Sequence, residues 1–373
     1  MKVELLVPPD TTLLSSMLYE GLLRVRSKCS EDVEEECLRS LLEELCSKDI
    51  RFNFTGNDIQ HTIRKKLSKE FRISLGNTLR DLMKLLATVR ITELRIGMKI
   101  LRTKRETQLL IGTPNFLKKG GGYSFQIMKA DRYMGISSID YRTLTEKITT
   151  YADLSGLALF FIGLASSYVT STRTEDVDNY YFLFFDLETL LRQVMKGDIR
   201  KWIEDIKDRV SEKIKEVIEY YGDTNDEAIT LTTIFNTYVL EALQESKVDY
   251  TGFRLVKVSR EGQTYKVYSD MPLRVYVSEK IYNNKELVEE ISRVTDVLVR
   301  RASRFVRGRD TFGDGYHAFL ALRYLYLFVT TDNFTYLSAM YRELHNAYNI
   351  ALNNKDPNAG EYLRCFLRSM IKS

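Results

Sequence analysis

The segment between Ile281 and Asp310 has the periodicity of one long amphipathic helix. Its apolar residues recur every three or four positions and therefore share one side, which has to be covered by other elements. These residues are Leu287, Ile291, Val294, Leu298, Ala302, Phe305 and Val306. Further helical segments follow at about 315–330, 332–353 and 358–371. Since the connections between these helices are short, the sequence predicts an antiparallel four-helix bundle at the end of the chain.

Arginine dominates another side of the same helix. At about 100° per residue, four arginines spaced by seven, four and three positions fall within a stripe roughly 60° wide. The stripe consists of Arg293, Arg300, Arg304 and Arg307, with Arg301 beside it. Like charges at this spacing repel one another, and guanidinium groups bind phosphate through two parallel hydrogen bonds, so we expect nucleic-acid phosphates here. The alternative is neutralisation by acidic groups elsewhere in the fold or by Glu286, Glu289, Glu290 and Asp296.

Positive charge is also concentrated in the first half of the chain. Residues 51–150 hold 20 Lys and Arg against 8 Asp and Glu, whereas all other residues hold 35 against 43. The net charge is thus +12 in this block and −8 outside it, although the whole chain carries only +4. A basic block within a nearly neutral protein is typical of a site for a polyanion. The candidate nucleic-acid contacts in this block are Arg64, Lys65, Lys66, Arg102, Lys104 and Arg105.

Three consecutive glycines follow two lysines in the segment Lys118-Lys119-Gly120-Gly121-Gly122. Glycine costs roughly 0.5 to 1 kcal/mol relative to alanine in regular structure, so such runs usually serve close backbone approach or mobility. The segment lies between two predicted strands, and we expect a loop whose lysines hold phosphates while its main chain approaches the bases. It lacks the GxxxxGK[ST] and GxGxxG spacings of nucleotide-binding loops. The alternative is a flexible hairpin tip without a ligand.

The length of 373 residues and the hydrophobic content of 44% suit a packed protein of two or three domains. The predicted fold class is α+β and predominantly helical. A mixed domain with small antiparallel sheets is expected over 1–277, with a sub-boundary near 140, and the bundle over 278–373. Strand-like patterns occur at 3–7, 51–55 and 89–128, and on both sides of the turn Glu261-Gly262. The apolar stretch from Leu154 to Val169 is about 16 residues long, which predicts a buried helix rather than a membrane span.

Residues that could carry catalysis or hold a metal are sparse. The four cysteines have no CxxC spacing and there are only 3 His, so no disulfide framework, zinc site or cofactor is expected. This cysteine usage favours a reducing cytoplasm. His317 and His345 are the candidate acid-base groups, although the arginine-to-histidine spacing of helical ribonucleases is missing, and Asp58 with His61 lacks a third metal ligand.

Three features extend over nearly the whole chain. They are the opening KVELLVPPD with the LLSSMLYEGLLRV helix after it, the glycine-rich loop in a central mixed domain, and the helical segment 278–373. In this layout the chain resembles the large subunit of archaeal type I-A CRISPR interference (Cascade) complexes. The content of 28% charged residues and only 5 Pro is also typical of a thermophile.

The resemblance implies a noncatalytic DNA-binding subunit of an RNA-guided complex in antiviral defence. It assigns Lys118 to Gly122 as the candidate loop for a short duplex motif, the protospacer-adjacent motif, and the Arg300 to Arg307 face as a surface for displaced DNA. In such complexes guide-RNA pairing reads most of the target sequence. The implied partners are DNA, guide RNA, the backbone and small subunits and a nuclease-helicase, without membrane association.

Two other classes stay open at this point. One is a helical ribonuclease in which His345 or His317 acts as acid and base. The other is a scaffold protein whose arginine face docks an acidic partner. Incubation with labelled RNA would identify the ribonuclease, and the salt dependence of DNA binding would separate a phosphate-binding protein from the scaffold.

Overall fold

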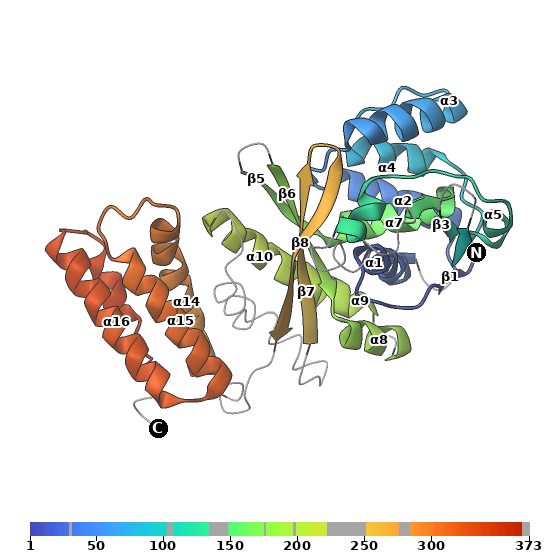
Figure 1. Ribbon diagram of the computed structural model, residues 1–373. Helices are drawn as coiled ribbons and strands as arrows, with labels where there is room; N and C mark the ends of the chain where they lie inside the picture. Colours follow the sequence, from blue (N-terminus) through green and yellow to red (C-terminus); the bar gives the residue numbers. More distant parts are fainter. Residues whose placement is uncertain are drawn as a thin grey trace. The chain divides into compact units, whose positions relative to one another are not determined.

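The computed structural model describes the chain apart from residues 30–31, 103–106, 134–147, 175–176, 197–198, 222–250, 276–283 and 368–373. It divides into two compact units (Figure 1). Unit 1 consists of residues 1–203 and 254–272, and unit 2 of residues 204–253 and 273–373. The boundary at 272 lies near the one predicted at 277, but unit 2 also contains an earlier segment. The sub-boundary predicted near residue 140 lies outside the described residues.

The first sheet of unit 1 has four strands in the order β1-β2-β3-β4. Their bounds are Val3–Leu6 for β1, Leu94–Arg102 for β2, Thr107–Gly112 for β3 and Ile148–Ala152 for β4. β2 pairs antiparallel with β3, but β1 with β2 and β3 with β4 pair parallel. The sheet is therefore mixed, and the prediction of an antiparallel sheet is wrong for it.

The second sheet of unit 1 also has four strands, in the order β5-β6-β7-β8. The bounds are Tyr168–Thr174 for β5, Val177–Phe185 for β6, Thr251–Glu261 for β7 and Thr264–Val275 for β8. The predicted hairpin is confirmed, because β7 and β8 flank a turn in which Gly262 has a φ of 57°. A positive φ is what glycine supplies in tight hairpin turns.

The core of unit 1 is built on two helices, α1 (Leu13–Cys29) and α7 (Leu154–Ser167). The prediction of a buried helix after Leu154 is confirmed, since every residue of α7 after this one is buried. The two helices approach closely where Gly21 faces Gly163. A Cβ atom on Gly21 would lie 2.0 Å from the Leu159 carbonyl oxygen, and one on Gly163 would lie 1.8 Å from the Met17 carbonyl oxygen. No side chain larger than hydrogen fits at this crossing.

Short helices complete unit 1 and carry most of its surface. They are α2 (Glu35–Ser47), the π-helix η1 (Asp58–Leu67), α3 (Ser68–Phe71), α4 (Leu79–Thr88), α5 (Pro114–Lys119), the 3-10 helix η2 (Ile127–Tyr133), α8 (Leu187–Lys196), α9 (Ile199–Lys201) and the π-helix η4 (Trp202–Lys207), which runs on into unit 2. Within the described residues, no helix combines the length and the apolarity that crossing a bilayer requires.

Unit 2 is helical in its described part apart from the first residues of β7 and the last residues of β8. Its helices are α10 (Asp208–Tyr221), α14 (Lys285–Val306), α15 (Gly315–Thr331), α16 (Phe334–Asn353) and the short 3-10 helix η5 (Ala359–Arg364). The three long predicted helices are present in α14, α15 and α16, but the fourth is only the 3-10 turn η5, so a four-helix bundle is not confirmed. Five of the apolar residues predicted to face a core are buried, whereas Phe305 and Val306 are exposed.

Two predicted strands are absent from the structure. Residues 51–55 form only an isolated bridge from Asn53 to Thr78, and the segment expected as a strand after Gly122 continues into the helix η2. A disulfide joins Cys29 to Cys37, contrary to the expectation that the cysteines stay unpaired. The pair is only eight residues apart in the sequence, with a Cα–Cα distance of 5.8 Å between the end of α1 and the start of α2.

Candidate nucleic-acid interface

The glycine segment forms a tight turn after helix α5. This helix begins with Pro114, which suits a first helical position, and ends at Gly120. Lys118 and Lys119 are thus the last residues of a helix, and the expectation that they sit in a hairpin loop is wrong. Helix termination by a glycine with positive φ explains the pattern, because this residue type ends many helices.

All three glycines have positive φ, namely 71° for Gly120, 90° for Gly121 and 88° for Gly122. A Cβ atom on Gly122 would lie 2.5 Å from the carbonyl oxygen of Ala152, so this glycine is needed for packing. A Cβ atom on Gly121 would meet no other atom within 4 Å, so the main chain there borders open space. The turn therefore has a packed end and an open middle.

Helix η1 holds the turn by one of its faces. Asp58, Thr62 and Lys66, spaced by four residues, all bind main-chain atoms of the segment 122–126. The Asp58 carboxylate accepts from Gln126 N at 2.8 Å, the Thr62 hydroxyl donates to Ser124 O at 2.6 Å, and Lys66 Nζ donates to Gly122 O at 2.7 Å. Lys66 therefore anchors the turn.

Buried groups beneath the turn support this arrangement. Phe125 is fully buried, with its ring centroid 5.0 Å from that of Phe161 in α7. Burial raises the pKa of Asp58, although hydrogen bonds from Gln126 and Thr55 oppose that shift. These hydrogen bonds occupy Asp58, and His61 is exposed, so the pair does not converge on a metal site.

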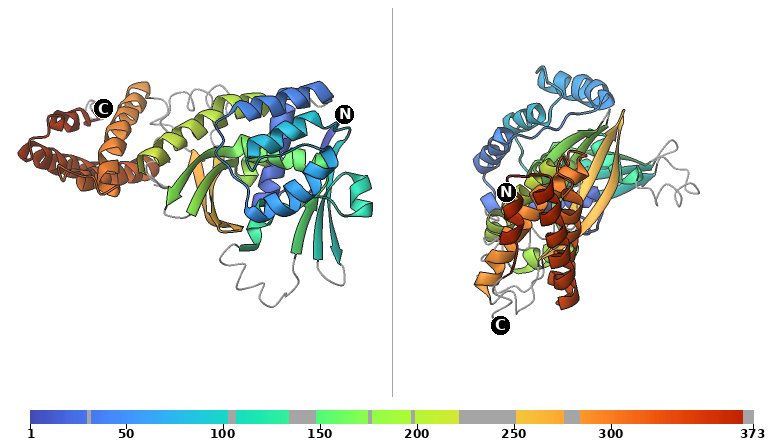
Figure 2. Two further views of the ribbon diagram at one scale, coloured as in Figure 1. Left: turned by 90° about the horizontal axis from the view of Figure 1, so that it is seen from above. Right: turned by 90° about the vertical axis from the view of Figure 1, so that its left-hand side faces the viewer.

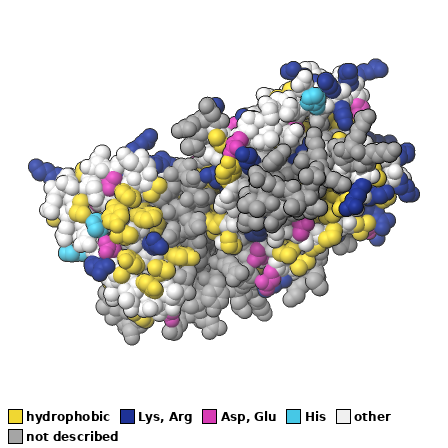
Figure 3. Space-filling model, viewed as in Figure 1, with side chains coloured by type: hydrophobic (Ala, Val, Ile, Leu, Met, Phe, Trp, Pro, Cys, Tyr) yellow, Lys and Arg dark blue, Asp and Glu magenta, His cyan; other side chains and the backbone are white. Residues whose placement is uncertain are grey.

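The helices η1, α3 and α5 carry exposed basic side chains. Arg64, Lys65 and Lys69 from η1 and α3 are exposed, as are Lys118 and Lys119 from α5. None of these five forms an ion pair with a described residue. Figure 3 shows Lys and Arg side chains gathered along the margin of unit 1 that carries α3 and α5. The Lys66–Gly122 hydrogen bond ties η1 to the turn after α5, although the two basic segments lie about fifty residues apart in the sequence, and we call these five residues the basic surface.

A pocket of about 680 Å³ opens beside the turn. Its charged lining residues are Lys66, Arg90, Glu70, Glu93 and Asp153, so acids and bases nearly balance. The Tyr123 hydroxyl donates to Glu70, and burial together with this carboxylate raises the pKa of Tyr123. The pocket is thus unsuited to phosphate. The exposed cations outside the pocket are better candidates for phosphate contacts.

Three predicted contacts of the basic block remain. Arg102 is exposed at the end of β2. Lys104 and Arg105 fall on 103–106, outside the described residues.

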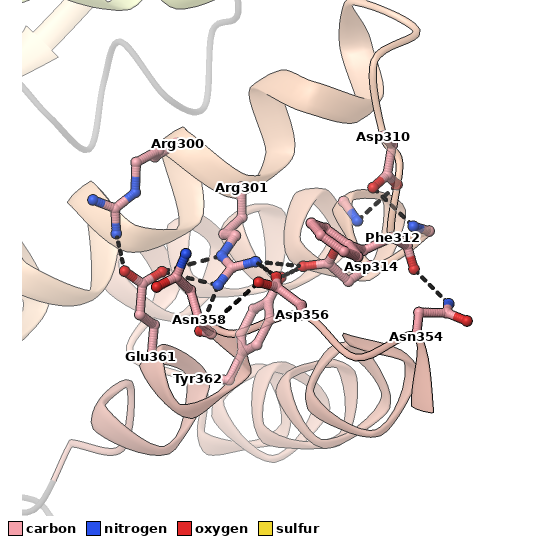
Figure 4. Close-up of polar contacts among 12 residues, drawn as sticks. Arg300, Arg301, Asp310, Phe312, Asp314, Asn354, Asp356, Asn358, Glu361 and Tyr362 are labelled. Carbon is pink, nitrogen blue, oxygen red and sulfur yellow. Dashed lines mark hydrogen bonds and ion pairs between the residues drawn. The ribbon is translucent and has the colours of Figure 1, made fainter. Parts of the chain in front are cut away.

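In unit 2, Arg301 is fully buried at the centre of an ionic cluster (Figure 4). Its guanidinium contacts the carboxylates of Asp314, Asp356 and Glu361. It also donates to Asn358 O at 2.5 Å and lies 5.1 Å from the Tyr362 ring centroid. Assigning Arg301 to nucleic acid is therefore wrong, because its donors are used inside the protein.

The same cluster sets the ionisation of its members. Burial disfavours the charged form of Asp356, but its hydrogen bond from Arg301 and the Asn358 amide hold its pKa below the ordinary value. Burial likewise opposes the charge on Arg301, yet Asp356 and the neighbouring acidic groups raise its pKa. The pKa of Tyr362 is raised by burial and by Asp314. The cluster joins α14 to the turn before α15 and to η5.

The rest of the arginine stripe is divided between pairing and exposure. Arg300 forms an ion pair with Glu361 at 2.9 Å. Neutralisation from elsewhere in the fold is thus correct for Arg300 and Arg301. Arg293 and Arg307 are exposed and Arg304 is half-buried, and no ion pair joins these three to a described residue.

The two histidines of unit 2, His317 and His345, have different partners. His317 Nδ1 lies 2.7 Å from a Glu343 carboxylate oxygen, and the other oxygen of Glu343 lies 3.3 Å from Arg342 Nε. Burial opposes ionisation of Glu343, but these partners lower its pKa overall. His345 is exposed and its Nε2 lies 2.9 Å from the Asn349 amide. Within the part of the chain described, no three His, Cys, Asp or Glu side chains converge to hold a metal ion.

Comparison with known proteins gives little further information. No protein-family model matches the chain. It is similar to an uncharacterized protein of Archaeoglobus fulgidus, with 26% identity over 97% of this chain and 98% of that protein. The similarity covers both units.

Proposed function

We propose that this chain is a noncatalytic nucleic-acid-binding protein, and more specifically the large subunit of an archaeal type I-A CRISPR interference complex. The observation that supports this most strongly is the basic surface of unit 1, whose five cations have no acidic partner among the described residues. Cations of this kind attract the phosphates of a polyanion and release its counterions.

The glycine turn gives this surface a second property. Lys118 and Lys119 stand beside Gly121, whose main chain borders open space. Lysines fix a duplex by its phosphates, while a backbone without side chains approaches base edges closely. This combination suits recognition of a short duplex motif, with guide RNA pairing reading the remainder of the target.

The displaced DNA strand would be held by the unpaired part of the arginine stripe. Only Arg293, Arg304 and Arg307 qualify, because Arg300 and Arg301 are neutralised within the fold. The partners in this proposal are DNA, guide RNA, the backbone and small subunits and the nuclease-helicase, in the cytoplasm and without a cofactor. Copurification from the native host tests this, since co-eluting guide RNA and backbone subunits are expected.

Salt-dependent binding of the full-length protein to duplex DNA tests the basic surface. Replacing Lys118 and Lys119 by alanine removes two phosphate contacts, so the slope of log affinity against log salt should become shallower by about 1 to 2 units. The matched control replaces Lys213 and Lys215 of α10, which should leave the slope unchanged. Equal slopes for the wild type and the Lys118/Lys119 variant would refute the assignment. Binding that does not depend on salt would instead favour the scaffold.

A second candidate, a ribonuclease, is favoured by one observation. Glu343 orients His317 through Nδ1, as carboxylates do for histidines that act as general bases. Incubation of the purified chain with labelled RNA tests this candidate, with His317→Ala as the variant and His345→Ala as its control. The noncatalytic proposal expects intact RNA with all three proteins. Cleavage that disappears only in His317→Ala would establish the ribonuclease.

A further inference from the structure

The strand β2 is longer than its neighbour β1. β1 pairs with it only from Val3 opposite Leu94 to Leu6 opposite Gly97. The remaining residues of β2, from Met98 to Arg102, pair with β3 on one side and with no described residue on the other. Figure 2 (left) shows β2 and β3 extending past the helices of unit 1. We call this unpaired side of residues 98–102 the open edge.

The side chains of the open edge are unusually apolar for solvent. Met98 is 36% exposed, Ile100 63% and Leu101 36%, and Leu6 is 56% exposed where β1 ends. Proteins commonly protect an edge strand with charged side chains, a bulge, a proline or a covering element, and the described residues of this edge supply only the charges of Lys99 and Arg102. Here the pairing with β3 is regular from Gly97 to Arg102, and none of these residues is proline. An edge with free backbone groups and apolar side chains is a template for another strand.

Charge indicates what kind of strand fits. Lys99 and Arg102 are exposed and have no ionic partner among the described residues. A second copy of this chain would bring the same cations to the edge, and like charges on neighbouring strands are destabilising. Nucleic acid would satisfy the cations but neither the strand-spaced backbone groups nor the side chain of Ile100. An extended polypeptide with alternating apolar and acidic residues supplies the backbone partners and places its apolar side chains beside Ile100 and an acidic side chain beside Lys99, because Lys99 and Ile100 lie on opposite faces of the strand.

We propose that the open edge binds an extended segment of a partner protein, which adds a fifth strand to the first sheet. At about 3.3 Å per residue the edge accommodates a segment of roughly five or six residues. Main-chain hydrogen bonds would supply affinity, and the apolar and acidic side chains of the segment would supply specificity. The open edge shares no residue with the basic surface, but it borders the glycine turn, since a Cβ atom on Gly120 would lie 3.9 Å from Leu101.

The probe for this proposal is a fluorescein-labelled heptapeptide of alternating glutamate and valine, titrated into the full-length protein. The control peptide has lysine in place of glutamate. The acidic peptide should bind at least tenfold more tightly, and its binding should slow amide hydrogen exchange in residues 98–102. Equal affinity for both peptides, or protection confined to other residues, would overturn the proposal.

Two substitutions test the roles of apolar contact and charge. Ile100→Lys should weaken binding of the acidic peptide at least fivefold, whereas Ile73→Lys, also at an exposed isoleucine, should leave it within twofold. The double variant Lys99→Glu with Arg102→Glu should prefer the lysine peptide, an inversion that loss of folding cannot produce. Unchanged preference in the double variant, or competition by a second copy of the chain or by duplex DNA at the same amides, would contradict the proposal.

Discussion

The clusters of basic residues in the two units differ in how far they are neutralised within the fold. In unit 1, Arg64, Lys65, Lys69, Lys118 and Lys119 face solvent without an ionic partner among the described residues. In unit 2, Arg301 is fully buried and Arg300 is paired with Glu361. The comparison teaches that the density of arginine along a helix does not measure the charge available to a ligand. The tertiary position of the acidic residues decides that.

Two carboxylates, Asp131 in unit 1 and Asp356 in unit 2, also differ in what holds them. In unit 1, burial raises the pKa of Asp131, whose carboxylate accepts from the backbone amides of Leu13 and Leu14. In unit 2, Asp356 is also buried, but its hydrogen bonds from Arg301 and the Asn358 amide lower its pKa. Asp131 is thus held by amides at the start of a helix, and Asp356 by a cation.

The largest expected effect comes from removing the cation at the centre of unit 2. Arg301→Met leaves the carboxylates of Asp314, Asp356 and Glu361 without their common partner. Breaking a buried pair on one side costs about 3 to 5 kcal/mol, so thermal unfolding should occur at a much lower temperature. Circular dichroism melts measure this.

The control for that variant is Arg300→Ala, which removes an exposed pair and should change stability by at most about 1 kcal/mol. Where Arg301→Met remains folded, its duplex affinity should equal that of the wild type. Reduced duplex affinity at unchanged stability would mean that Arg301 contacts DNA, and the contrast between the units would fail.

A smaller effect is expected at the glycine turn of unit 1. Gly122→Ala combines a positive φ with a clash against the Ala152 carbonyl, and should destabilise the protein by about 2 to 3 kcal/mol. Gly121→Ala has the same backbone strain but open space, and should cost only about 1 kcal/mol. Urea denaturation distinguishes these variants. Equal losses at both positions would show that the turn has no packed end.

The smallest expected effect is on the acid dependence of stability. Because the pKa of Asp356 is lowered in the fold, its contribution is fully present above the ordinary value of 3.8 and is lost as pH falls through the lowered value. Asp356→Asn should therefore reduce the loss of stability at low pH. The pKa of Asp131 is raised, so its contribution to stability becomes more favourable as pH falls through that raised value. Asp131→Asn should therefore increase the loss of stability at low pH. Melts between about pH 2 and 6 test both signs. Identical slopes for the two variants would contradict the distinction.

The parts of the fold predicted from sequence are those specified by local pattern. The helix from Lys285 to Val306 and the hairpin at Gly262 follow from periodicity and turn chemistry. Phe305 and Val306 continue the apolar period, but they lie at the end of the helix and are exposed. The partners of Arg301 come from 13, 55 and 60 residues further along the chain, and no local pattern reveals such contacts.

The sequence predicted which basic residues belong to the candidate site, but not the contacts that hold them in place. Charge counting identified Arg64, Lys65, Lys118 and Lys119, which are exposed and have no ionic partner among the described residues. The anchoring role of Lys66 was missed. A usable signal was present, since Asp58, Thr62 and Lys66 repeat at four-residue intervals and predict one polar face on a helix. The main-chain partners at 122–126 are set by tertiary packing and are not specified by that repeat.

The most direct test of the contrast between the units compares two matched fourfold variants in duplex binding. One replaces Arg64, Lys65, Lys118 and Lys119 by alanine, and the other replaces Arg293, Arg300, Arg304 and Arg307. Affinity of the full-length protein for the same duplex is measured over a range of salt concentrations. The unit 1 variant should bind at least tenfold more weakly, with a salt slope shallower by about 2 to 4 units, while the unit 2 variant stays within twofold of the wild type. An unchanged slope in the unit 1 variant, or a larger loss in the unit 2 variant, would contradict the assignment of duplex binding to the basic surface.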